Sequence, residues 1–361
     1  MKYLRYVRAL EYNLRHPLKL ETGPIHLQIE VSTFCNLACV MCPHPTMIKN
    51  PRHMTLAQFR KVFDTLQPLK ISLSGLGEPF LNPEMLAIIR YASQNGAATI
   101  TTSNLTVITP ELARGIVQSG LGLLKGSIDS TNSETYLAVR QRDMHAQVLQ
   151  ALENLRNAKR ELGATTPAVR LQFVMQRSNF REIPHILDLS REYGVDAVNF
   201  QPLELATEEF VDEALVADLV GDMDKDEFRD ILELSAAKAK QSGVATNLNS
   251  LFRDFEGVWA KYRLRKCPDP PSAICLMPWT SVYITVDGDV RPCCSFPLTT
   301  EATLGNIFTD DFMQVWNSPR YQGLRKSFQQ GKRPFKICRN CLAPTLSRLV
   351  KSSGFAKYMM R

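Results

Sequence analysis

The chain alternates short apolar runs with longer amphipathic segments from residue 26 onward. Each short run is bounded by turn-forming residues, which is typical of buried strands. The predicted strands are 26–31, 70–74, 98–102, 123–129, 169–175 and 197–201. Between them, apolar positions recur at helical spacing. The predicted helices are 55–66, 82–96, 109–120, a helical pair over 133–162, and 181–193.

Start and stop signals support these helices. Thr55 followed by Gln58 matches the capping-box pattern. Thr109 and Asn82 each precede a proline, which gives a cap and a proline at the first helical position. Glycines mark the helix ends and are found at Gly96, Gly120, Gly163 and Gly194.

Six strand–helix units in succession predict an α/β fold with a parallel sheet and right-handed crossovers. The periodicity fits a doubly wound sheet and a barrel equally well. In both architectures the functional loops lie at the C-terminal ends of the strands.

The second part of the chain has a different pattern. Residues 207–247 are acidic and helical in character, and a proline-rich stretch from Cys267 to Cys275 follows. Segments 279–285 and 290–292 predict a β-hairpin around an Asp-Gly turn, and 312–316 predicts a helix. We expect an N-terminal helical arm (1–25), a core (26–205), a helical connecting segment (206–265) and a small C-terminal α+β domain (266–361).

The composition is that of a globular protein, with 44% apolar and 22% charged residues in a chain of 361. The net charge of +7 is modest, and we expect no nucleic-acid partner. No run of 18 apolar residues occurs, so no transmembrane segment is expected. The amphipathic arm packs on the main domain or, as an alternative, touches an acidic membrane surface. Free thiols and open iron–sulfur clusters survive in a reducing compartment, so the cysteines discussed below predict a cytoplasmic location.

Chemistry concentrates in the stretch Cys35-Asn-Leu-Ala-Cys39-Val-Met-Cys42. Thiolates select zinc, copper(I) or iron–sulfur clusters, and a closed structural site needs four ligands. Three thiols can hold three irons of a [4Fe–4S] cube and leave the fourth iron open. The alternatives are a small zinc knuckle or a buried thiol cluster.

This C-x3-C-x2-C motif, with Met41 before the last cysteine, resembles that of the radical S-adenosylmethionine (radical SAM) enzymes. The resemblance implies a partial (βα)6 barrel, a SAM-binding [4Fe–4S] cluster held by Cys35, Cys39 and Cys42, and SAM on the open iron. It implies reductive cleavage of SAM to a 5′-deoxyadenosyl radical, with an electron from a partner such as flavodoxin or ferredoxin.

Further motifs resemble the SAM-binding positions of this family. Gly77-Glu78-Pro79 is similar to the family's Gly-Gly-Glu-Pro motif, although Leu76 replaces its first glycine. Glu78 would bind the amino group of SAM. Ser127-x-Asp129 resembles the family's Ser-x-Asp-Gly motif. The other candidates that the resemblance suggests near SAM are Met41, Ser103, Asn104 and Arg140, with Arg142 as a neighbour of similar chemistry and Phe200 as either an adenine contact or a core residue.

The C-terminal third carries a second cysteine set. The Cys338-x2-Cys341 pair, with Cys275 and Cys293, could hold an auxiliary [4Fe–4S] cluster, or alternatively a structural zinc. The surrounding sequence resembles the SPASM and twitch extensions of radical SAM enzymes. Six cysteines lie outside the first motif, and once four of them bind one cluster the remaining two cannot fill a second, which favours the one-cluster twitch form. Cys267 and Cys294 are left over. Either could donate a hydrogen atom to a substrate radical.

The substrate is the least constrained feature. An N-terminal arm of about 25 residues is shorter than the leader-peptide-binding domain of many peptide maturases, and this favours oxidation, epimerisation or rearrangement of a sugar, an aminocyclitol or a nucleotide-like molecule. The alternatives are a peptide- or protein-modifying maturase of the SPASM type and, from another class, a non-catalytic iron–sulfur carrier.

Overall fold

The computed structural model describes residues 2–203, 221–264, 274–294 and 302–335, together with 338 and 341. The chain divides into two compact units. The first comprises residues 1–34, 51–99 and 267–361, and the second comprises residues 35–50 and 100–266. Segment 204–220, Cys267 and the last residues of the chain lie outside the described residues.

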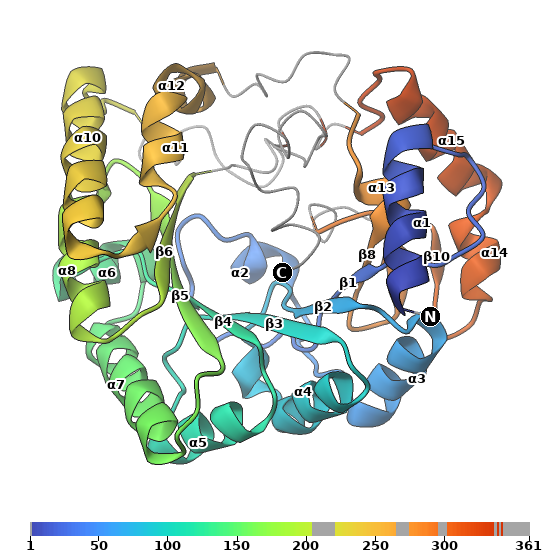
Figure 1. Ribbon diagram of the computed structural model, residues 1–361, viewed down its shortest axis with the longest axis horizontal. Coiled ribbons are helices and arrows are strands. Elements are labelled where there is room, and N and C mark those ends of the chain that lie inside the picture. Colours follow the sequence, from blue (N-terminus) through green and yellow to red (C-terminus); the bar gives the residue numbers. More distant parts are fainter. Residues whose placement is uncertain are drawn as a thin grey trace. The chain divides into compact units, whose positions relative to one another are not determined.

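In the first unit, strand β1 (His26–Ile29) lies between two parallel neighbours, β2 (Lys70–Leu73) and β8 (Ser281–Ile284). Strand β9 (Asp289–Arg291) is antiparallel to β8, and β10 (Gly305–Asn306) is antiparallel to β9. Segments from the two ends of the sequence thus share one sheet (Figure 1). The helices of this unit are α1 (Lys2–Arg15), α3 (Leu56–Leu66), the short η1 (Pro79–Leu81), α4 (Met85–Gln94), α13 (Met277–Thr280), α14 (Phe312–Trp316) and α15 (Pro319–Gln329).

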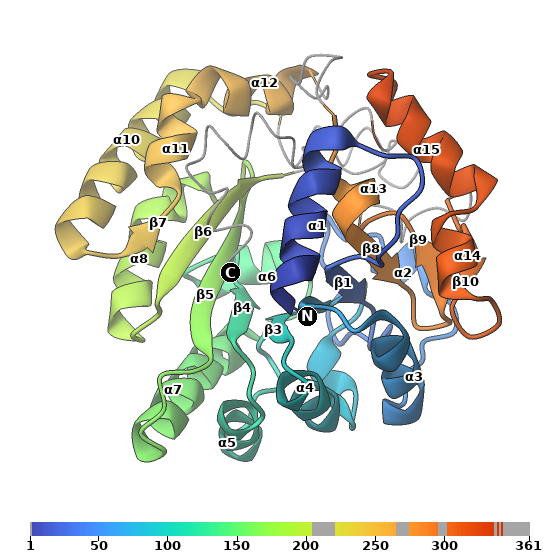
Figure 2. The ribbon, with the colours of Figure 1, turned by 45° about the vertical axis from the view of Figure 1, so that its right-hand side comes forward.

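In the second unit, strands run parallel in the order β3 (Ala98–Ser103, of which residues 98–99 belong to the first unit), β4 (Leu123–Ser127), β5 (Ala168–Met175), β6 (Ala197–Pro202) and β7 (Ala245–Thr246). Its helices are α2 (His44–Met47), α5 (Pro110–Gln118), α6 (Ser133–Arg140), α7 (His145–Glu161), η2 (Phe180–Glu182), α8 (Ile183–Glu192), α10 (Lys225–Ser242), α11 (Leu248–Arg253) and α12 (Phe255–Leu264). Helices α7 and α8 lie on the outer side of β5 and β6 (Figure 2).

Alternation along the strands explains their two faces. On β5, Leu171, Phe173 and Met175 are buried against the helices, whereas Arg170 and Val174 on the other face are half-buried. A parallel strand with one apolar face and one mixed face can therefore pack on helices and still line a site. Two of the predicted site residues lie at C-terminal strand ends, since Ser103 is the last residue of β3 and Ser127 the last residue of β4.

All six strands predicted for the core are present, and α6 and α7 are the predicted helical pair. The capping box of Thr55 and Gln58 and the cap of Thr109 are confirmed. The predicted helix start at Asn82 is wrong, because α4 begins at Met85. The Asn82 side chain closes a turn ahead of α4, because its Oδ1 accepts from the N–H of Glu84 at 2.9 Å, while its Nδ2 donates to Val31 O at 2.7 Å and to Met54 O at 2.8 Å.

The predicted hairpin is confirmed as β8 and β9, with Gly288 at a φ of 87° in its turn. The predicted helix 312–316 is α14. Among the described helices, none combines the length and the apolar composition needed to cross a bilayer.

Candidate functional site

The three closely spaced cysteines lie in the part of the second unit that spans residues 35–50. The N–H of Cys42 donates to Cys39 O at 3.0 Å, which closes a turn before α2. All three thiols are partly exposed. Burial raises the pKa of Cys42 to about 11, and the nearby thiols of Cys39 and Cys35 also raise it. The three sulfur atoms therefore stand close enough for their charges to interact.

The C-terminal end of α6 holds this cysteine loop. The N–H of Val40 donates to Val139 O at 3.0 Å, and the N–H of Ala38 donates to Arg140 O at 3.4 Å. The last carbonyls of a helix have no partner within the helix, so they are ready acceptors for the loop. Two of the loop's amides are thereby fixed between the cysteines.

Asn36, between the first two cysteines, is bonded to the segment after β3. Its Nδ2 donates to Thr106 Oγ1 at 2.7 Å, and its Oδ1 accepts from Asn104 Nδ2 at 2.9 Å. Asn104, a predicted SAM contact, thus helps to position the cysteine loop. Ser103 is buried, and its hydroxyl accepts from the N–H of Leu105 at 2.9 Å.

Arg140 is brought to the same loop by α6. Its Nη1 lies 3.5 Å from Cys39 Sγ, and its Nη2 lies 2.6 Å from a carboxylate oxygen of Asp129. The other oxygen of Asp129 accepts from the N–H of Val174 at 2.8 Å. Two predicted SAM-binding residues, Asp129 and Arg140, are therefore paired with each other beside a predicted cluster ligand. Arg142, by contrast, is exposed.

The remaining candidates of this unit are placed as follows. Ser127 ends β4, is half-buried, and stands opposite Gln172 of β5 in the register. Met41 is half-buried. Phe200 is 1% exposed and its ring lies 5.6 Å from that of Phe173, so it is a core residue.

The donor set is that of an iron–sulfur cube with one open iron. In a cube each cysteine binds its own iron, so the thiols need to be near one another without converging on one point. The soft thiol donors of Cys35, Cys39 and Cys42 therefore fit a [4Fe–4S] cluster with one open iron.

The Gly77-Glu78-Pro79 turn belongs to the first unit. A Cβ on Gly77 would lie 2.5 Å from Ser32 O and 2.6 Å from Phe34 O, so only glycine fits. This close approach lets the N–H of Glu78 donate to Phe34 O at 2.7 Å. The turn is thereby bonded to the residue that directly precedes Cys35 in the chain.

Glu78 itself is buried, at 2% exposed. One carboxylate oxygen accepts from the N–H of Phe80 at 3.1 Å and caps the short helix η1, which starts at Pro79. The cap fixes the direction of the side chain. A carboxylate held in this way is a suitable partner for an ammonium group.

The second cysteine set lies in the first unit. Cys275 and Cys338 are buried, Cys293 and Cys341 are half-buried, and Cys294 is exposed. Burial raises the pKa of Cys275 to about 12, and the nearby thiols of Cys341 and Cys338 also raise it. Three of the four predicted auxiliary ligands are therefore neighbours in space, as a thiolate-bound cluster requires.

Cys267, one of the two candidate hydrogen donors, lies outside the described residues. The other, Cys294, is the residue after Cys293 in the chain and is near Tyr283, whose pKa is raised mainly by burial and also by charge on Glu30 and Cys294.

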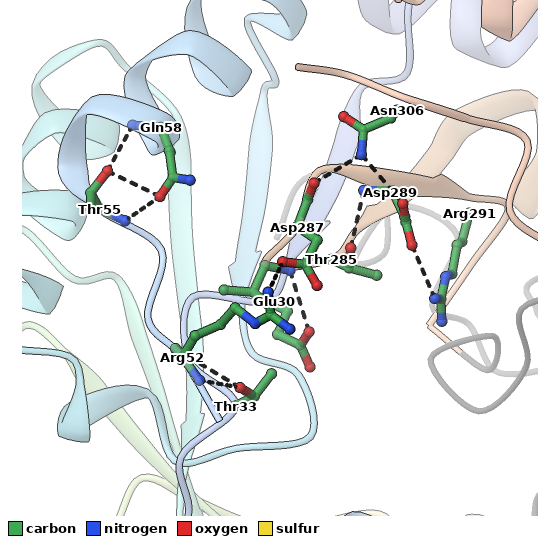
Figure 3. A network of polar contacts seen from close by, with 11 residues as sticks. Glu30, Thr33, Arg52, Thr55, Gln58, Thr285, Asp287, Asp289, Arg291 and Asn306 are labelled. Atoms are coloured by element: carbon green, nitrogen blue, oxygen red, sulfur yellow. Dashed lines mark hydrogen bonds and ion pairs between the residues drawn. The ribbon is translucent and has the colours of Figure 1, made fainter. Parts of the chain in front are cut away.

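Sequence reasoning missed a polar network beside these motifs, shown in Figure 3. Glu30 lies in the predicted strand 26–31, directly follows β1 in the structure, and is 4% exposed. Arg52 pairs with Asp287 at 2.9 Å. The signal for Glu30 was available, because a charged residue inside a buried strand needs partners.

Comparisons with known proteins identify two family domains in the chain. The model of the radical SAM superfamily matches residues 29–170, and that of the SPASM iron–sulfur cluster-binding domain matches residues 275–342. The second match covers all four predicted auxiliary ligands.

Two relatives illustrate the range of similar proteins. A tungsten-containing aldehyde ferredoxin oxidoreductase cofactor-modifying protein of Pyrococcus furiosus is 22% identical over 316 residues, which is 83% of each chain. The mycofactocin maturase MftC of Mycolicibacterium smegmatis is 29% identical over 174 residues, which is 48% of this chain and 43% of MftC. The second alignment therefore spans less than half of that relative.

Among solved structures, Streptococcus suis SuiB bound to precursor peptide SuiA has a TM-score of 0.64. The identity is 16%, and the match covers 89% of this chain and 70% of SuiB. This likeness concerns the fold, and it confirms the predicted fold class, a mixed α/β chain with a parallel sheet of the partial-barrel type.

Proposed function

The chain is a radical SAM protein with a C-terminal SPASM-type iron–sulfur domain, and from this premise we propose that it modifies a peptide or protein substrate by radical chemistry. One observation carries the radical-chemistry part of the proposal: a radical SAM domain, which would start a radical reaction, and a SPASM domain, which would help to finish it, occur in one chain. When bound, the [4Fe–4S] cluster and SAM supply a 5′-deoxyadenosyl radical that removes hydrogen from a substrate C–H bond.

The residues of the chain provide the setting for this chemistry. Cys35, Cys39 and Cys42 would hold the SAM-binding cluster, and the end of α6 fixes their loop through backbone bonds. The capped carboxylate of Glu78 would bind the amino group of SAM, since a charge-assisted bond of this kind is worth about 1.5–3 kcal/mol. Ser127, at the end of β4, would contact SAM at its ribose or carboxylate.

The auxiliary ligands would serve the second half of the reaction. Cys275, Cys293, Cys338 and Cys341 would hold a closed cluster that takes an electron from the substrate radical, and Cys294 or Cys267 would serve as a hydrogen donor if the reaction is an epimerisation. A flavodoxin or ferredoxin would supply the initial electron.

A peptide substrate is favoured over a small molecule by the relatives. MftC is a maturase, and SuiB was solved with a precursor peptide. This reverses the preference drawn from the length of the N-terminal arm. A small-molecule substrate is the second candidate, because the Pyrococcus furiosus relative, which aligns over 83% of this chain, is a cofactor-modifying protein.

The experiment is deuterium transfer under anaerobic conditions. The reconstituted enzyme is incubated with SAM, dithionite and deuterated candidate peptides, chosen from short open reading frames beside the gene, and in parallel with deuterated sugars and aminocyclitols. We expect deuterium in 5′-deoxyadenosine only with a peptide. Transfer only from a small molecule contradicts the peptide proposal. SAM binding without any cleavage contradicts the enzyme proposal, and the absence of both SAM binding and 5′-deoxyadenosine favours a non-catalytic carrier.

A further inference from the structure

Glu30 stands at the C-terminal end of β1, in the middle of the sheet of the first unit. Its N–H donates to Ile284 O of β8 at 2.9 Å, and its side chain is almost fully buried. A buried carboxyl group is costly unless each oxygen finds donors. The hydrogen-bond donors that contact the Glu30 carboxylate therefore indicate its role.

The two oxygens of Glu30 reach to opposite sides of β1. One accepts from the N–H of Leu76 at 3.0 Å, and Leu76 lies inside the Gly75–Pro79 turn. The other accepts from the N–H of Val286 at 3.3 Å, and Val286 opens the turn of the β8–β9 hairpin. The hydroxyl of Tyr283 adds a weaker contact at 3.4 Å. One side chain thus bonds the SAM-motif turn to the hairpin that leads to Cys293.

The turn is packed on Glu30 as tightly as the backbone allows. A Cβ on Gly75 would lie 2.5 Å from Cγ and 2.6 Å from Oε1 of Glu30. No larger residue fits at Gly75 unless the Glu30 side chain moves. The glycine of this turn therefore serves the contact with Glu30 as well as the geometry of the turn.

A second link joins the same hairpin to the base of the cysteine loop (Figure 3). The backbone of Arg52 bonds to Thr33 in both directions, with Thr33 N–H donating to Arg52 O at 2.9 Å and Arg52 N–H donating to Thr33 Oγ1 at 2.8 Å. Thr33 and Arg52 thereby close the base of the segment that carries the three cysteines. The Arg52 guanidinium pairs with Asp287 at 2.9 Å, and Asp287 O accepts from Asn306 Nδ2 at 2.8 Å.

We propose that Glu30 and Arg52 are positioning residues that fasten the β8–β9 hairpin of the cluster-binding domain to the SAM-motif turn and to the base of the cysteine loop. The hairpin, the turn and the loop base then behave as one piece. Within the first unit, the SAM-motif turn and the hairpin that leads to Cys293 therefore keep a fixed arrangement, whose use in catalysis rests on the proposed function. The proposal does not depend on whether the substrate is a peptide or a small molecule.

The first test is Glu30→Gln with amide hydrogen exchange in the cluster-free protein. The amide group of Gln has a single acceptor oxygen, so its NH₂ must face one of the two N–H donors. We expect the N–H group that faces the NH₂, either that of Leu76 or that of Val286, to exchange roughly tenfold faster, which corresponds to about 1.4 kcal/mol. The control is Glu21→Gln, whose side chain is 75% exposed, and it leaves both amides unchanged. Unchanged exchange at both amides overturns the bridging role.

The second test uses the exposed ion pair of Arg52 and Asp287, whose replacement should leave the protein folded. Arg52→Asp and Asp287→Arg should each raise exchange at the hairpin about two- to fivefold, as expected for a surface ion pair. The double charge swap should restore protection, and failure of the swap to restore it overturns the role of Arg52. In the loaded enzyme, Glu30→Gln should raise the ratio of SAM cleaved to product formed, because the SAM-motif turn and the hairpin that leads to Cys293 are no longer held together. An unchanged ratio overturns the coupling.

Discussion

Arg140 and Asp129 form an ion pair inside the second unit, with 2.6 Å between guanidinium and carboxylate, and both side chains are buried. Burial lowers the pKa of Arg140, but the charges of Asp129 and Cys39 raise it by more, so the guanidinium stays charged. The guanidinium of Arg140 therefore lies between the carboxylate of Asp129 and the thiol of Cys39, a predicted cluster ligand, and it connects the end of α6 to the cysteine loop.

Asp129→Asn should destabilise the protein strongly. Removing one partner of a buried pair leaves the other charge uncompensated, which costs about 3–5 kcal/mol. The matched control is Glu161→Gln, since Glu161 pairs with Arg114 at 3.2 Å and both side chains are 48% exposed. The Glu161→Gln substitution should lower the free energy of unfolding by no more than about 1 kcal/mol. Urea unfolding of the three proteins provides the measurement, and equal losses for the two variants would show that burial of the pair has no energetic consequence.

Gly77→Ala and Gly323→Ala should have opposite effects. The new methyl group at Gly77 meets backbone oxygens of Ser32 and Phe34 at 2.5–2.6 Å, so the SAM-motif turn must move. Gly323 lies inside α15, and a Cβ there meets nothing within 4 Å. Alanine is favoured over glycine in a helix by about 0.5–1 kcal/mol. We expect lower thermal stability and weaker SAM binding for Gly77→Ala, and slightly higher stability with unchanged SAM binding for Gly323→Ala. A Gly77→Ala protein that binds SAM like the wild type would contradict the packing argument.

Much of the fold could be predicted from local patterns. Strand alternation, the Thr55–Gln58 capping box and the Asp-Gly hairpin turn all act over a few residues, and the structure contains each of them. The short elements were missed, since strands such as β7, with two residues, have no period to detect. The helix start at Asn82 was wrong because its side-chain oxygen bonds to the N–H of Glu84 in a turn ahead of α4, and a cap signal does not distinguish such a turn from the first turn of a helix.

The candidate site also contains features that local patterns predict and features that they do not. Motif spacing pointed to the cysteines and to Gly77-Glu78-Pro79, whereas pairings across long sequence separations could not be predicted. Arg140 and Cys39 are 101 residues apart, and Glu30 and Val286 are 256 apart. Which polar partner a buried side chain chooses depends on how the strands are ordered in the sheet. That order places β8 beside β1, and no local signal encodes it.

Acidification should loosen the base of the cysteine loop through His53. Its ring stacks on Phe34 at 4.4 Å, its Nδ1 lies 3.1 Å from Ser32 Oγ, and burial lowers its pKa. A lowered folded-state pKa means that the unfolded chain binds the proton more tightly, so stability is fully present above the unfolded value of about 6.5 and is lost as pH falls below it. The free energy of unfolding of the wild type minus that of His53→Gln should decrease between pH 8 and pH 5. A difference that stays constant with pH would contradict this role.

Cysteine-to-alanine variants of the two cysteine sets should lose different activities. Cys35→Ala, Cys39→Ala and Cys42→Ala should each abolish formation of 5′-deoxyadenosine, because the cluster that would bind SAM loses a ligand. Cys338→Ala should leave SAM cleavage largely intact and abolish product formation, because its cluster would act after hydrogen abstraction. Chromatography of 5′-deoxyadenosine alongside mass analysis of the substrate separates the two effects. If Cys338→Ala removes both activities equally, this division of labour is wrong.

Metal analysis decides between an auxiliary cluster and a structural zinc at Cys275, Cys293, Cys338 and Cys341. Two [4Fe–4S] cubes predict about eight irons per chain, since each cube has four irons, and a zinc at the second site predicts about four irons and one zinc. The Cys338→Ala variant is the informative control, because it should lose about four irons in the first case and the zinc in the second. Chelation of anaerobically prepared protein, followed by refilling with iron and sulfide, should restore the full iron count only if both sites are clusters. Zinc that survives iron removal and leaves with Cys338→Ala would establish the structural site instead.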